Sequence, residues 1–453
     1  MPHYDLVIVG AGSGNMIVNR RFADWRVAIV ESGRFGGTCL NVGCIPTKMY
    51  VYPADLAATA DDWPRLGLAG TAPRADWPRI RDRIFGRIDP LAAAAREQRV
   101  ERSPNVTVYE TSARFTGPQT LRLDSGETLT AEHVVLATGT RPIVPEVIAA
   151  SGVTFHTSDT IMRLEHLPER LVILGGGFVA AEFAHVFTAF GVPVTVVTRH
   201  DLLRHHDRDV RTRLTDLVRD RWDLRTGATV TSATEHDGEV RLGLDGGTEV
   251  GGDVLLVATG RTPNSDRLDL AAGGVLTHPD GRIVVDEYQR TTAAGVWALG
   301  DASTEHRLKH VANHEARTVA HNLLHPDDPI ASDHRFVPGA VFTHPQIATV
   351  GATEDELVET GRRYVGAVVG YDQIAGGWAM EDTTGFCKLL ADPESGRLLG
   401  AHLMGPQASI LIQPLIQAMS FGLGVREMAR GQYWIHPALT EVVENALLAL
   451  HLS

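Results

Sequence analysis

Cysteine is scarce in this chain: only Cys39, Cys44 and Cys387 occur among 453 residues. Three cysteines are too few for the disulfide scaffold of a secreted protein of this size. Cys387 has no cysteine neighbour in the sequence, and we interpret it as a buried apolar side chain without a redox role. Cys39 and Cys44 stand close together in the chain, so this pair needs a chemical explanation.

Basic runs and long apolar runs are both missing. The formal net charge is −13 and no cluster of Lys and Arg occurs, so we expect no nucleic acid partner. No apolar stretch approaches the roughly eighteen residues of a membrane span, and the N-terminus MPHYDLVIVG leads into a strand instead of a signal peptide. We therefore expect a cytoplasmic protein with no membrane partner.

The rest of the composition is that of an ordinary globular protein, with 43% hydrophobic and 21% charged residues. A chain of 453 residues exceeds what one hydrophobic core usually organises. We therefore expect about two to four domains.

A glycine-rich turn follows the first apolar run, in DLVIVGAGSGN. Gly10, Gly12 and Gly14 allow the backbone to approach a pyrophosphate, which then sits at the positive N-terminal end of the next helix. Asn15 stands where a third motif glycine is usual. Glu31 ends the second apolar run, at the spacing where a carboxylate accepts the hydroxyls of a ribose. This pattern predicts a dinucleotide site.

The same pattern recurs in RLVILGGGFVAAE, with Gly175, Gly177 and Ala180 in the GxGxxA form. The acidic residue that would hold a ribose is missing at the corresponding position, and Arg199 and Arg204 follow there. Arginine suits the 2′-phosphate of NADPH, so we favour NADPH over NADH. The alternative is that both arginines are solvated side chains in a chain rich in arginine.

Two further apolar runs end in ATG, in HVVLATGTRP and DVLLVATGRTPN, and a third run ends in GVWALGDAS. We expect the first two to close the nucleotide-binding domains, with the ATG turns letting the chain cross near a bound dinucleotide. Asp301 in the third run is a candidate to accept a hydroxyl of a flavin ribitol, although a Gly-Asp pair alone indicates only a turn.

The segment GGTCLNVGCIPTK holds the cysteine pair. Cys39 and Cys44 can meet across one helical turn and oxidise to a disulfide. Zinc would need two more Cys or His ligands nearby, so we expect no metal. A structural disulfide is disfavoured in a reducing cytoplasm, where persistent disulfides are usually catalytic. Lys48 follows Cys44 by four residues, and we expect it to pair with Glu182 beside a flavin.

Together these motifs resemble those of the class I pyridine nucleotide-disulfide oxidoreductases, and WIHPALTEVVENA resembles the family's C-terminal catalytic segment. The resemblance covers nearly the whole chain. It implies an α/β fold with two Rossmann-like dinucleotide-binding domains, for FAD and NADPH, and a C-terminal α+β dimerisation domain. The implied FAD domain covers 1–145 and 265–332, the NADPH domain 146–264 and the dimerisation domain 333–453.

The resemblance also implies a role for each catalytic residue. Cys44 is the sulfur nearest the flavin, and Cys39 is the interchange thiol that attacks the substrate disulfide. The leaving thiolate takes a proton from His436, which Glu441 orients. Phe178 stands where many members keep an aromatic gate over the flavin, and it is equally compatible with core packing.

The cofactor contacts that the resemblance implies fall into two sets. For FAD, the residues are Gly10, Gly12, Gly14, Glu31, Gly37, Thr38, Lys48, Ala113, Thr138, Gly139, Glu182, Gly300 and Asp301. For NADPH and the crossing between the two domains, they are Gly175, Gly177, Phe178, Arg199, Arg204, Gly260 and Arg261.

The expected substrate is a small disulfide. The C-terminus ALLALHLS lacks the extra cysteines of members that serve bulky or metal substrates. Segments such as KHVANHEARTVAHNLL and GGWAMEDTTG resemble those of the family members that reduce mycothione. We therefore favour a reductase of mycothione; the alternatives are a dihydrolipoamide dehydrogenase or a reductase of another small disulfide. A transhydrogenase should lack the cysteine pair, and a non-catalytic scaffold should have lost Cys39, Cys44 or His436, all of which are present. The resemblance further implies a homodimer in which His436 completes the other subunit's site.

Overall fold

The first parallel sheet grows from the apolar run at the N-terminus. In the computed structural model, which describes residues 1–452, β1 (His3–Val9) lies between β2 (Val27–Val30) and β6 (Thr128–Leu136), parallel to both. The strand order is β3-β2-β1-β6-β5-β4, and β16 pairs with the second half of β6. The remaining strands are β3 (Val106–Tyr109), β4 (Ala113–Gly117), β5 (Thr120–Leu123) and β16 (Val296–Ala298). Ser453, the last residue of the expected dimerisation domain, lies outside the described residues.

The connection from β1 to β2 differs from the prediction. Instead of a long helix after the glycine turn, two short 3₁₀ turns occur, at Gly14–Met16 and Arg20–Phe22. Asn19 between them is extended (φ −135°) and its side chain caps the second turn. Arg99, from α3 (Trp77–Val100), donates to the Asn15 side chain at 2.7 Å and to its carbonyl at 2.8 Å. These contacts replace hydrogen bonds that a continuous helix would make internally.

The second parallel sheet carries the second glycine turn. Its order is β10-β9-β8-β14, all parallel. Its strands are β8 (Leu171–Leu174), β9 (Val194–Thr198), β10 (Asp223–Thr226) and β14 (Val254–Val257), with helices α5 (Phe178–Ala189) and α6 (Arg208–Val218). An antiparallel sheet of β11 (Val230–His236), β12 (Glu239–Leu244) and β13 (Glu249–Gly252) lies beside it. Because β8 and β14 are fully apolar runs, their side chains are buried on both faces.

The two ATG turns mark where the chain crosses between these sheets. β7 (Thr140–Pro142) and β15 (Arg261–Pro263) form an antiparallel pair, so the two crossings lie side by side. Gly139 and Gly260 end the turns with φ of +62° and +134°, a region that favours glycine. This arrangement agrees with the role expected for the ATG segments.

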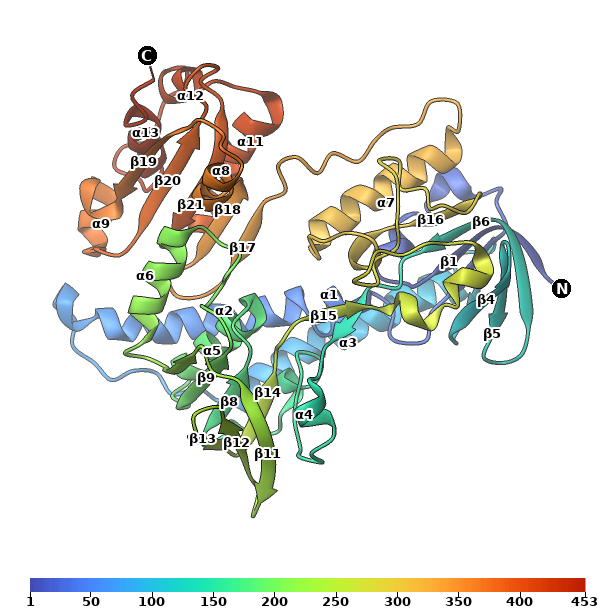
Figure 1. Cartoon of the computed structure of the whole chain (residues 1–453), viewed down its shortest axis with the longest axis horizontal. Helices are drawn as coiled ribbons and strands as arrows, with labels where there is room; N and C mark the ends of the chain where they lie inside the picture. Colours follow the sequence, from blue (N-terminus) through green and yellow to red (C-terminus); the bar gives the residue numbers. More distant parts are fainter. Residues whose placement is uncertain (453) are drawn as a thin grey trace.

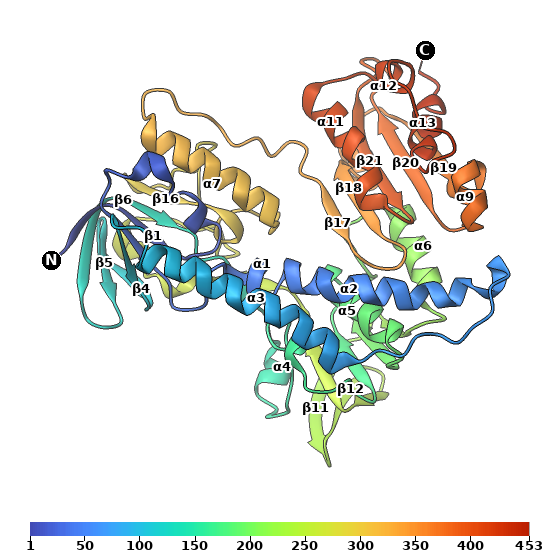
Figure 2. The ribbon, with the colours of Figure 1, turned by 180° about the vertical axis from the view of Figure 1, so that it is seen from behind.

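The helices α1 (Gly37–Asn41) and α2 (Cys44–Ala58) run between the lobes of the molecule, as Figures 1 and 2 show. α2 packs against α5 and α3 in a hydrophobic cluster that includes Tyr50, Trp77 and Phe187. The short α4 (Glu146–Ala149) packs on β11, and α7 (Lys309–Leu324) covers the first sheet. The α1–α2 segment is therefore held by both nucleotide-binding lobes.

The C-terminal domain is an antiparallel sheet covered by short helices (Figure 1). The strand order is β17-β18-β21-β20-β19. The strands are β17 (Gly339–Val341), β18 (Ile347–Gly351), β19 (Val365–Gly370), β20 (Phe386–Ala391) and β21 (Leu398–Met404). The helices are α8 (Glu354–Glu359), α9 (Ala375–Met380), α10 (Ala408–Leu411), α11 (Gln413–Phe421), α12 (Val425–Arg430) and α13 (Glu441–Leu448). The expected fold class is confirmed.

Cys387 lies in β20 and is fully buried, as expected for an apolar core residue. Within residues 1–452, no helix combines the length and apolar character needed to cross a membrane.

A buried lysine joins the second nucleotide-binding domain to the C-terminal domain. Lys388 is almost fully buried and donates to Asp207, Asp209 and Glu354 at 2.8, 2.7 and 2.7 Å. Burial disfavours its charge, yet the three carboxylates raise the pKa of Lys388 above its usual value. Asp207 also caps α6 and accepts from the first amide of α8 at 3.1 Å. This cluster therefore fixes two helices from different domains.

We expect Lys388→Met to lower the melting temperature strongly, because it leaves the fully buried Asp207 carboxylate without its cation. Breaking a buried ion pair from one side costs about 3–5 kcal/mol. Arg363→Met is the matched control, since Arg363 pairs with Glu394 where both side chains are more than three-quarters exposed and such pairs contribute about 1 kcal/mol or less. Thermal unfolding of both holoenzymes checks this, and equal melting temperatures would contradict it.

Candidate active site

The cysteine pair spans a break between two helices. Cys39 lies in α1 and Cys44 opens α2. The sequence predicted contact across one helical turn, but residues five apart on a continuous helix point about 140° apart. The chain instead breaks at Val42 and Gly43, where a Cβ at Gly43 would lie 2.8 Å from the Thr38 carbonyl oxygen. Glycine therefore allows the sharp return that brings the two sulfurs together.

Both cysteines are free thiols in the structure, and each shifts the pKa of the other. The neighbouring Cys39 thiol lowers the pKa of Cys44 to about 7, with the charge of Lys48 acting in the same direction and burial opposing both. The neighbouring Cys44 sulfur and burial raise the pKa of Cys39. The start of a helix also favours an anion at Cys44. In the reduced pair, Cys44 therefore ionises at a lower pH than Cys39.

Lys48 and Glu182 form the expected ion pair. The Lys48 Nζ lies 2.6 and 2.8 Å from the two carboxylate oxygens, and Glu182 is buried. The Phe342 amide, from the C-terminal domain, donates to the same carboxylate at 3.0 Å. Phe178 lies one turn before Glu182 on α5, so both side chains face the same cavity. The helix that starts at the second glycine turn thus carries its side chains to the cysteine pair.

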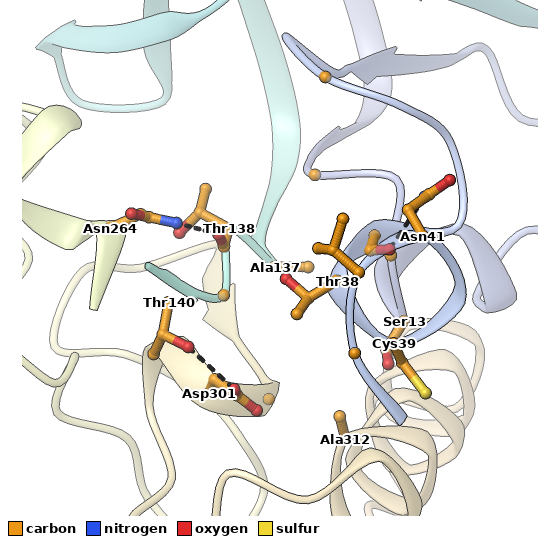
Figure 3. A pocket seen from close by; sticks show the side chains of 18 of the residues that line it. Ser13, Thr38, Cys39, Asn41, Ala137, Thr138, Thr140, Asn264, Asp301 and Ala312 are labelled. Atoms are coloured by element: carbon orange, nitrogen blue, oxygen red, sulfur yellow. Dashed lines mark hydrogen bonds between the residues drawn. The ribbon is translucent and has the colours of Figure 1, made fainter. Parts of the chain in front are cut away.

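These groups line one elongated cavity of about 560 Å³, and Figure 3 shows part of it. Glu31 lies at the end of β2, where its carboxylate accepts from the Ala11 amide at 2.6 Å and the Gly33 amide at 2.7 Å. The cysteine pair and Lys48 line the same cavity. The Glu31 carboxylate and the cysteine pair therefore line the same cavity.

Glycine backbones form the middle of the cavity. Gly10 has φ +107°, and any Cβ there would collide with the Ala137 carbonyl. Gly37 also has positive φ, and a Cβ there would lie 2.8 Å from Gly12 Cα. Gly14 does not line the cavity; it packs against β1 and Ala137, where a Cβ would be crowded. The shape and the backbone amides suit the diphosphate of an elongated dinucleotide.

The opposite wall is braced by hydrogen bonds that Figure 3 shows in part. Thr140 donates to Asp301 at 3.0 Å, and the Asn264 amide donates to the Thr138 carbonyl at 2.8 Å. Arg261 is directed at Thr140, donating to its hydroxyl and its carbonyl at 2.8 Å each. Further expected residues on this cavity are Thr38, Ala113, Gly139 and Gly300.

The second glycine turn, at Gly175 and Gly177, does not line this cavity. Gly175 has φ +136° and Gly177 caps α5 with its backbone exposed. The Leu203 amide donates to the carbonyl of Gly176 at 2.8 Å, which holds the loop after β9 against the turn. Arg199 and Arg204 are exposed on this loop. They are therefore positioned beside an open helix start.

His436 and Glu441 form a pair away from the cavity. The His436 Nδ1 lies 2.7 Å from the Glu441 Oε1, at the start of α13. The His436 side chain is 72% exposed, while Glu441 is mostly buried. Figure 1 shows α13 in the C-terminal lobe, distant from α1. The histidine is oriented by the Glu441 carboxylate, and its side chain is exposed on this chain.

Several cavity residues were missed by sequence reasoning. Ser13, Thr140, Asn264 and Lys309 line the cavity. Only Lys309 carried a usable signal, because the chain has just three lysines and this one opens the helix that follows Asp301. Thr140 and Asn264 act through contacts between segments far apart in the sequence, which no local pattern reveals.

Comparisons with known proteins agree with this geometry. Residues 4–316 match the family described as pyridine nucleotide-disulphide oxidoreductase, and residues 337–447 match its dimerisation domain. The chain is 55% identical to a mycothione reductase of Mycobacterium tuberculosis, over 99% of this chain and 100% of that protein. It is 33% identical to a dihydrolipoyl dehydrogenase of Halobacterium salinarum, over 98% and 95% of the two chains. An HOCl-induced flavoprotein disulfide reductase of Escherichia coli superposes with a TM-score of 0.86 at 28% identity, covering 98% of this chain and 99% of that one.

Proposed function

The chain belongs to the pyridine nucleotide-disulphide oxidoreductase family, and from this membership we propose that it is a cytoplasmic, NADPH-dependent reductase of mycothione. It is a flavoprotein disulfide reductase that uses FAD and a nicotinamide nucleotide. The observation that carries the choice of substrate is the 55% identity to a mycothione reductase along the whole length of both chains. The match to the dimerisation domain indicates a homodimer.

The long cavity suits FAD, which when bound supplies the transfer of an electron pair between the nicotinamide and the cysteine sulfurs. We assign the FAD to residues 1–145 and 265–332, the NADPH to 146–264 and the subunit contact to 333–453. Glu31 would hold the adenosine ribose, the glycine backbones the diphosphate, and Asp301 the ribitol. Lys48, neutralised by buried Glu182, would lie beside the flavin ring.

The reduced cysteine pair supports a complete disulfide exchange. The Cys39 sulfur attacks the substrate disulfide, which forms a mixed disulfide and releases the first thiolate; His436 gives that thiolate a proton. The Cys44 thiolate then attacks Cys39 in the mixed disulfide, which restores the Cys39–Cys44 bond and releases the second product as a thiolate, which takes a proton from the solvent. One disulfide is reduced to two thiols, and the protein pair is oxidised by the same two electrons. The low pKa of Cys44 suits it for this second attack.

A single assay separates the candidate substrates. We expect NADPH oxidation by the purified holoenzyme to be fastest with mycothione and slow with glutathione disulfide and lipoamide. NADH in place of NADPH serves as the cofactor comparison. Preference for lipoamide with NADH would overturn the proposal and favour a dihydrolipoamide dehydrogenase.

Arg199 and Arg204 are expected to select NADPH through its 2′-phosphate. Because each charge-assisted contact to a phosphate contributes about 1.5–3 kcal/mol, replacing both arginines by alanine should raise the KM for NADPH by about a hundredfold or more. The KM for NADH should change little, since NADH has no 2′-phosphate.

The control for this pair is Arg363→Ala, which removes an equally exposed arginine from the C-terminal domain. Steady-state kinetics with both cofactors gives the measurement. An unchanged ratio of the two KM values in the double variant would show that the arginines are solvated side chains without a part in cofactor choice.

A further inference from the structure

Glu315 is a buried carboxylate of α7 to which the proposed mechanism gives no role. Its side chain is 1% exposed, and its Oε2 accepts from the Gly300 amide at 2.6 Å. Gly300 and Asp301 form a turn that lines the cavity, and Figure 3 shows Asp301 accepting from Thr140. Glu315 therefore holds the backbone of the turn that carries Asp301.

His334 brings a second polar group to the same carboxylate. Its Nε2 lies 3.0 Å from the Glu315 Oε1, and its side chain is about one-third exposed. In the part of the chain that the structure describes, no lysine or arginine forms an ion pair with Glu315. A buried carboxylate without a cation is costly in free energy. The protonated imidazole of His334 is therefore the group that can neutralise it.

His334 belongs to the segment 325–338, which connects α7 to β17 of the C-terminal domain (Figure 1). This connecting segment is attached along α7 by several hydrogen bonds. The Ser332 hydroxyl donates to the Thr318 hydroxyl at 3.1 Å, and the His310 Nε2 lies 2.9 Å from the Pro338 carbonyl oxygen. These contacts flank the buried carboxylate along the helix, so the path of the connecting segment fixes the position of His334.

We propose that Glu315 and His334 are positioning residues for the flavin. Glu315 holds the turn of Gly300 and Asp301, and the protonated imidazole of His334 neutralises this carboxylate. When His334 loses its proton, the turn is held less firmly and the flavin dissociates faster. Neither residue lines the cavity, so both act through the backbone of the turn. This inference rests on the proposed placement of the flavin ribitol at Asp301.

The electrostatics of His334 agree with this assignment. The contact with Glu315 raises the pKa of His334, burial opposes this rise, and the charges of Glu315, Asp333 and Glu305 act in the same direction as the contact. A histidine whose pKa is raised in the folded protein stabilises it fully below the ordinary histidine pKa, and this contribution is lost as the pH rises through the raised value. We therefore expect the flavin to be retained less well as the pH rises above about 6.5.

Other titratable and charged groups surround His334, on α7, on the turn before it and on the connecting segment. Burial lowers the pKa of His306 and of His314, which favours their neutral forms. Asp333 is ionised throughout, because Arg335 lowers its pKa to about 2. The remaining groups are Glu305, His310 and Arg317. All of them stay unchanged when His334 alone is replaced, so a pH dependence that disappears with His334 belongs to it.

The test is the rate of flavin dissociation from the diluted holoenzyme, followed by the rise in flavin fluorescence from about pH 6 to about pH 9. The temperature is one at which circular dichroism shows every variant to be folded. Glu315→Gln should release the flavin about tenfold faster than the wild type at the low end of this range, because a hydrogen bond to a charged acceptor is replaced by one to a neutral acceptor. Its rate should no longer depend on pH.

His334→Gln separates a positioning role from a merely structural one. This variant should release the flavin faster than the wild type at the low end of the pH range and at nearly the wild-type rate at the high end. A merely structural role would change the rate equally at every pH. His321→Gln is the matched control, because His321 contacts the same connecting segment at the Asp328 carbonyl oxygen, 2.9 Å away. It should keep the pH dependence of the wild type.

An unchanged rate of flavin dissociation in Glu315→Gln would overturn the inference, and so would a wild-type pH dependence in His334→Gln. Should Glu315→Gln not fold, the pH dependence of His334→Gln decides, because this side chain is only partly buried.

Asp301→Asn distinguishes a failure of the inference from a failure of the flavin placement on which it rests. We expect this variant to release the flavin faster as well. An unchanged rate in Asp301→Asn would overturn the placement of the ribitol, whereas a faster rate there with an unchanged rate in Glu315→Gln would overturn the inference alone. The measurement needs neither NADPH nor a disulfide, so a failure of mycothione as the substrate would show only in the turnover assay.

Discussion

Replacing Cys39 by serine is expected to abolish disulfide reduction while leaving the bound flavin reducible by NADPH. Hydride transfer precedes thiol exchange, and a serine hydroxyl cannot attack the substrate disulfide. Loss of the nucleophile should lower kcat by about 10⁴-fold or more. Turnover is measured with mycothione, and flavin reduction by its visible absorbance under anaerobic conditions.

Cys44→Ser should behave differently from Cys39→Ser. Cys44 has the lower pKa of the reduced pair, so its loss should remove the long-wavelength thiolate–flavin absorption of the two-electron-reduced enzyme. Cys387→Ala is the control, because Cys387 is fully buried in β20 and should affect turnover little. A Cys39→Ser enzyme that reduced mycothione at the wild-type rate would show that the exchange runs through another group.

Local sequence patterns predicted the glycine turns and the ion pair between Lys48 and Glu182. The glycine turns at Gly10 and Gly175 were visible because a positive φ beside a close carbonyl requires glycine. The pairing of Lys48 with Glu182 was expected from the resemblance, and the structure confirms it with contacts of 2.6 and 2.8 Å.

The contacts that the sequence did not reveal are long-range. The helix expected after Gly14 is replaced by short 3₁₀ turns, where Arg99 from a distant helix donates to the carbonyl oxygens of Asn15 and Val18. Lys388 binds three carboxylates from two domains, and its own strand reads as an ordinary apolar run. Lys309 lies nearly three hundred residues from Ser13, with which it shares a hydrogen bond. Such partners are set by the tertiary fold, which residue spacing does not encode.

The geometry of His436 bears on whether each active site is shared between two chains. In one chain, His436 is exposed and lies in the C-terminal lobe, whereas the cysteine pair lines the cavity between the nucleotide-binding lobes. Glu441 fixes the orientation of the ring at 2.7 Å, although this chain presents no disulfide to it. An oriented imidazole on an outer surface is what a site shared between two subunits would need, and residues 337–447 match a dimerisation domain.

We therefore expect His436→Ala and Cys39→Ser homodimers to be nearly inactive, and heterodimers of the two to recover about half of the wild-type activity by the symmetry of a two-site dimer. If the sites are shared, one site of the heterodimer combines an intact Cys39 with an intact His436, and the other has neither. If each chain built its own site, every site would lack one of the two groups and nothing would be recovered. Co-expression with two affinity tags isolates the heterodimer, and re-isolated homodimers from the same preparation serve as the control. A verified heterodimer without activity would show that His436 acts in the site of its own chain or takes no part in catalysis.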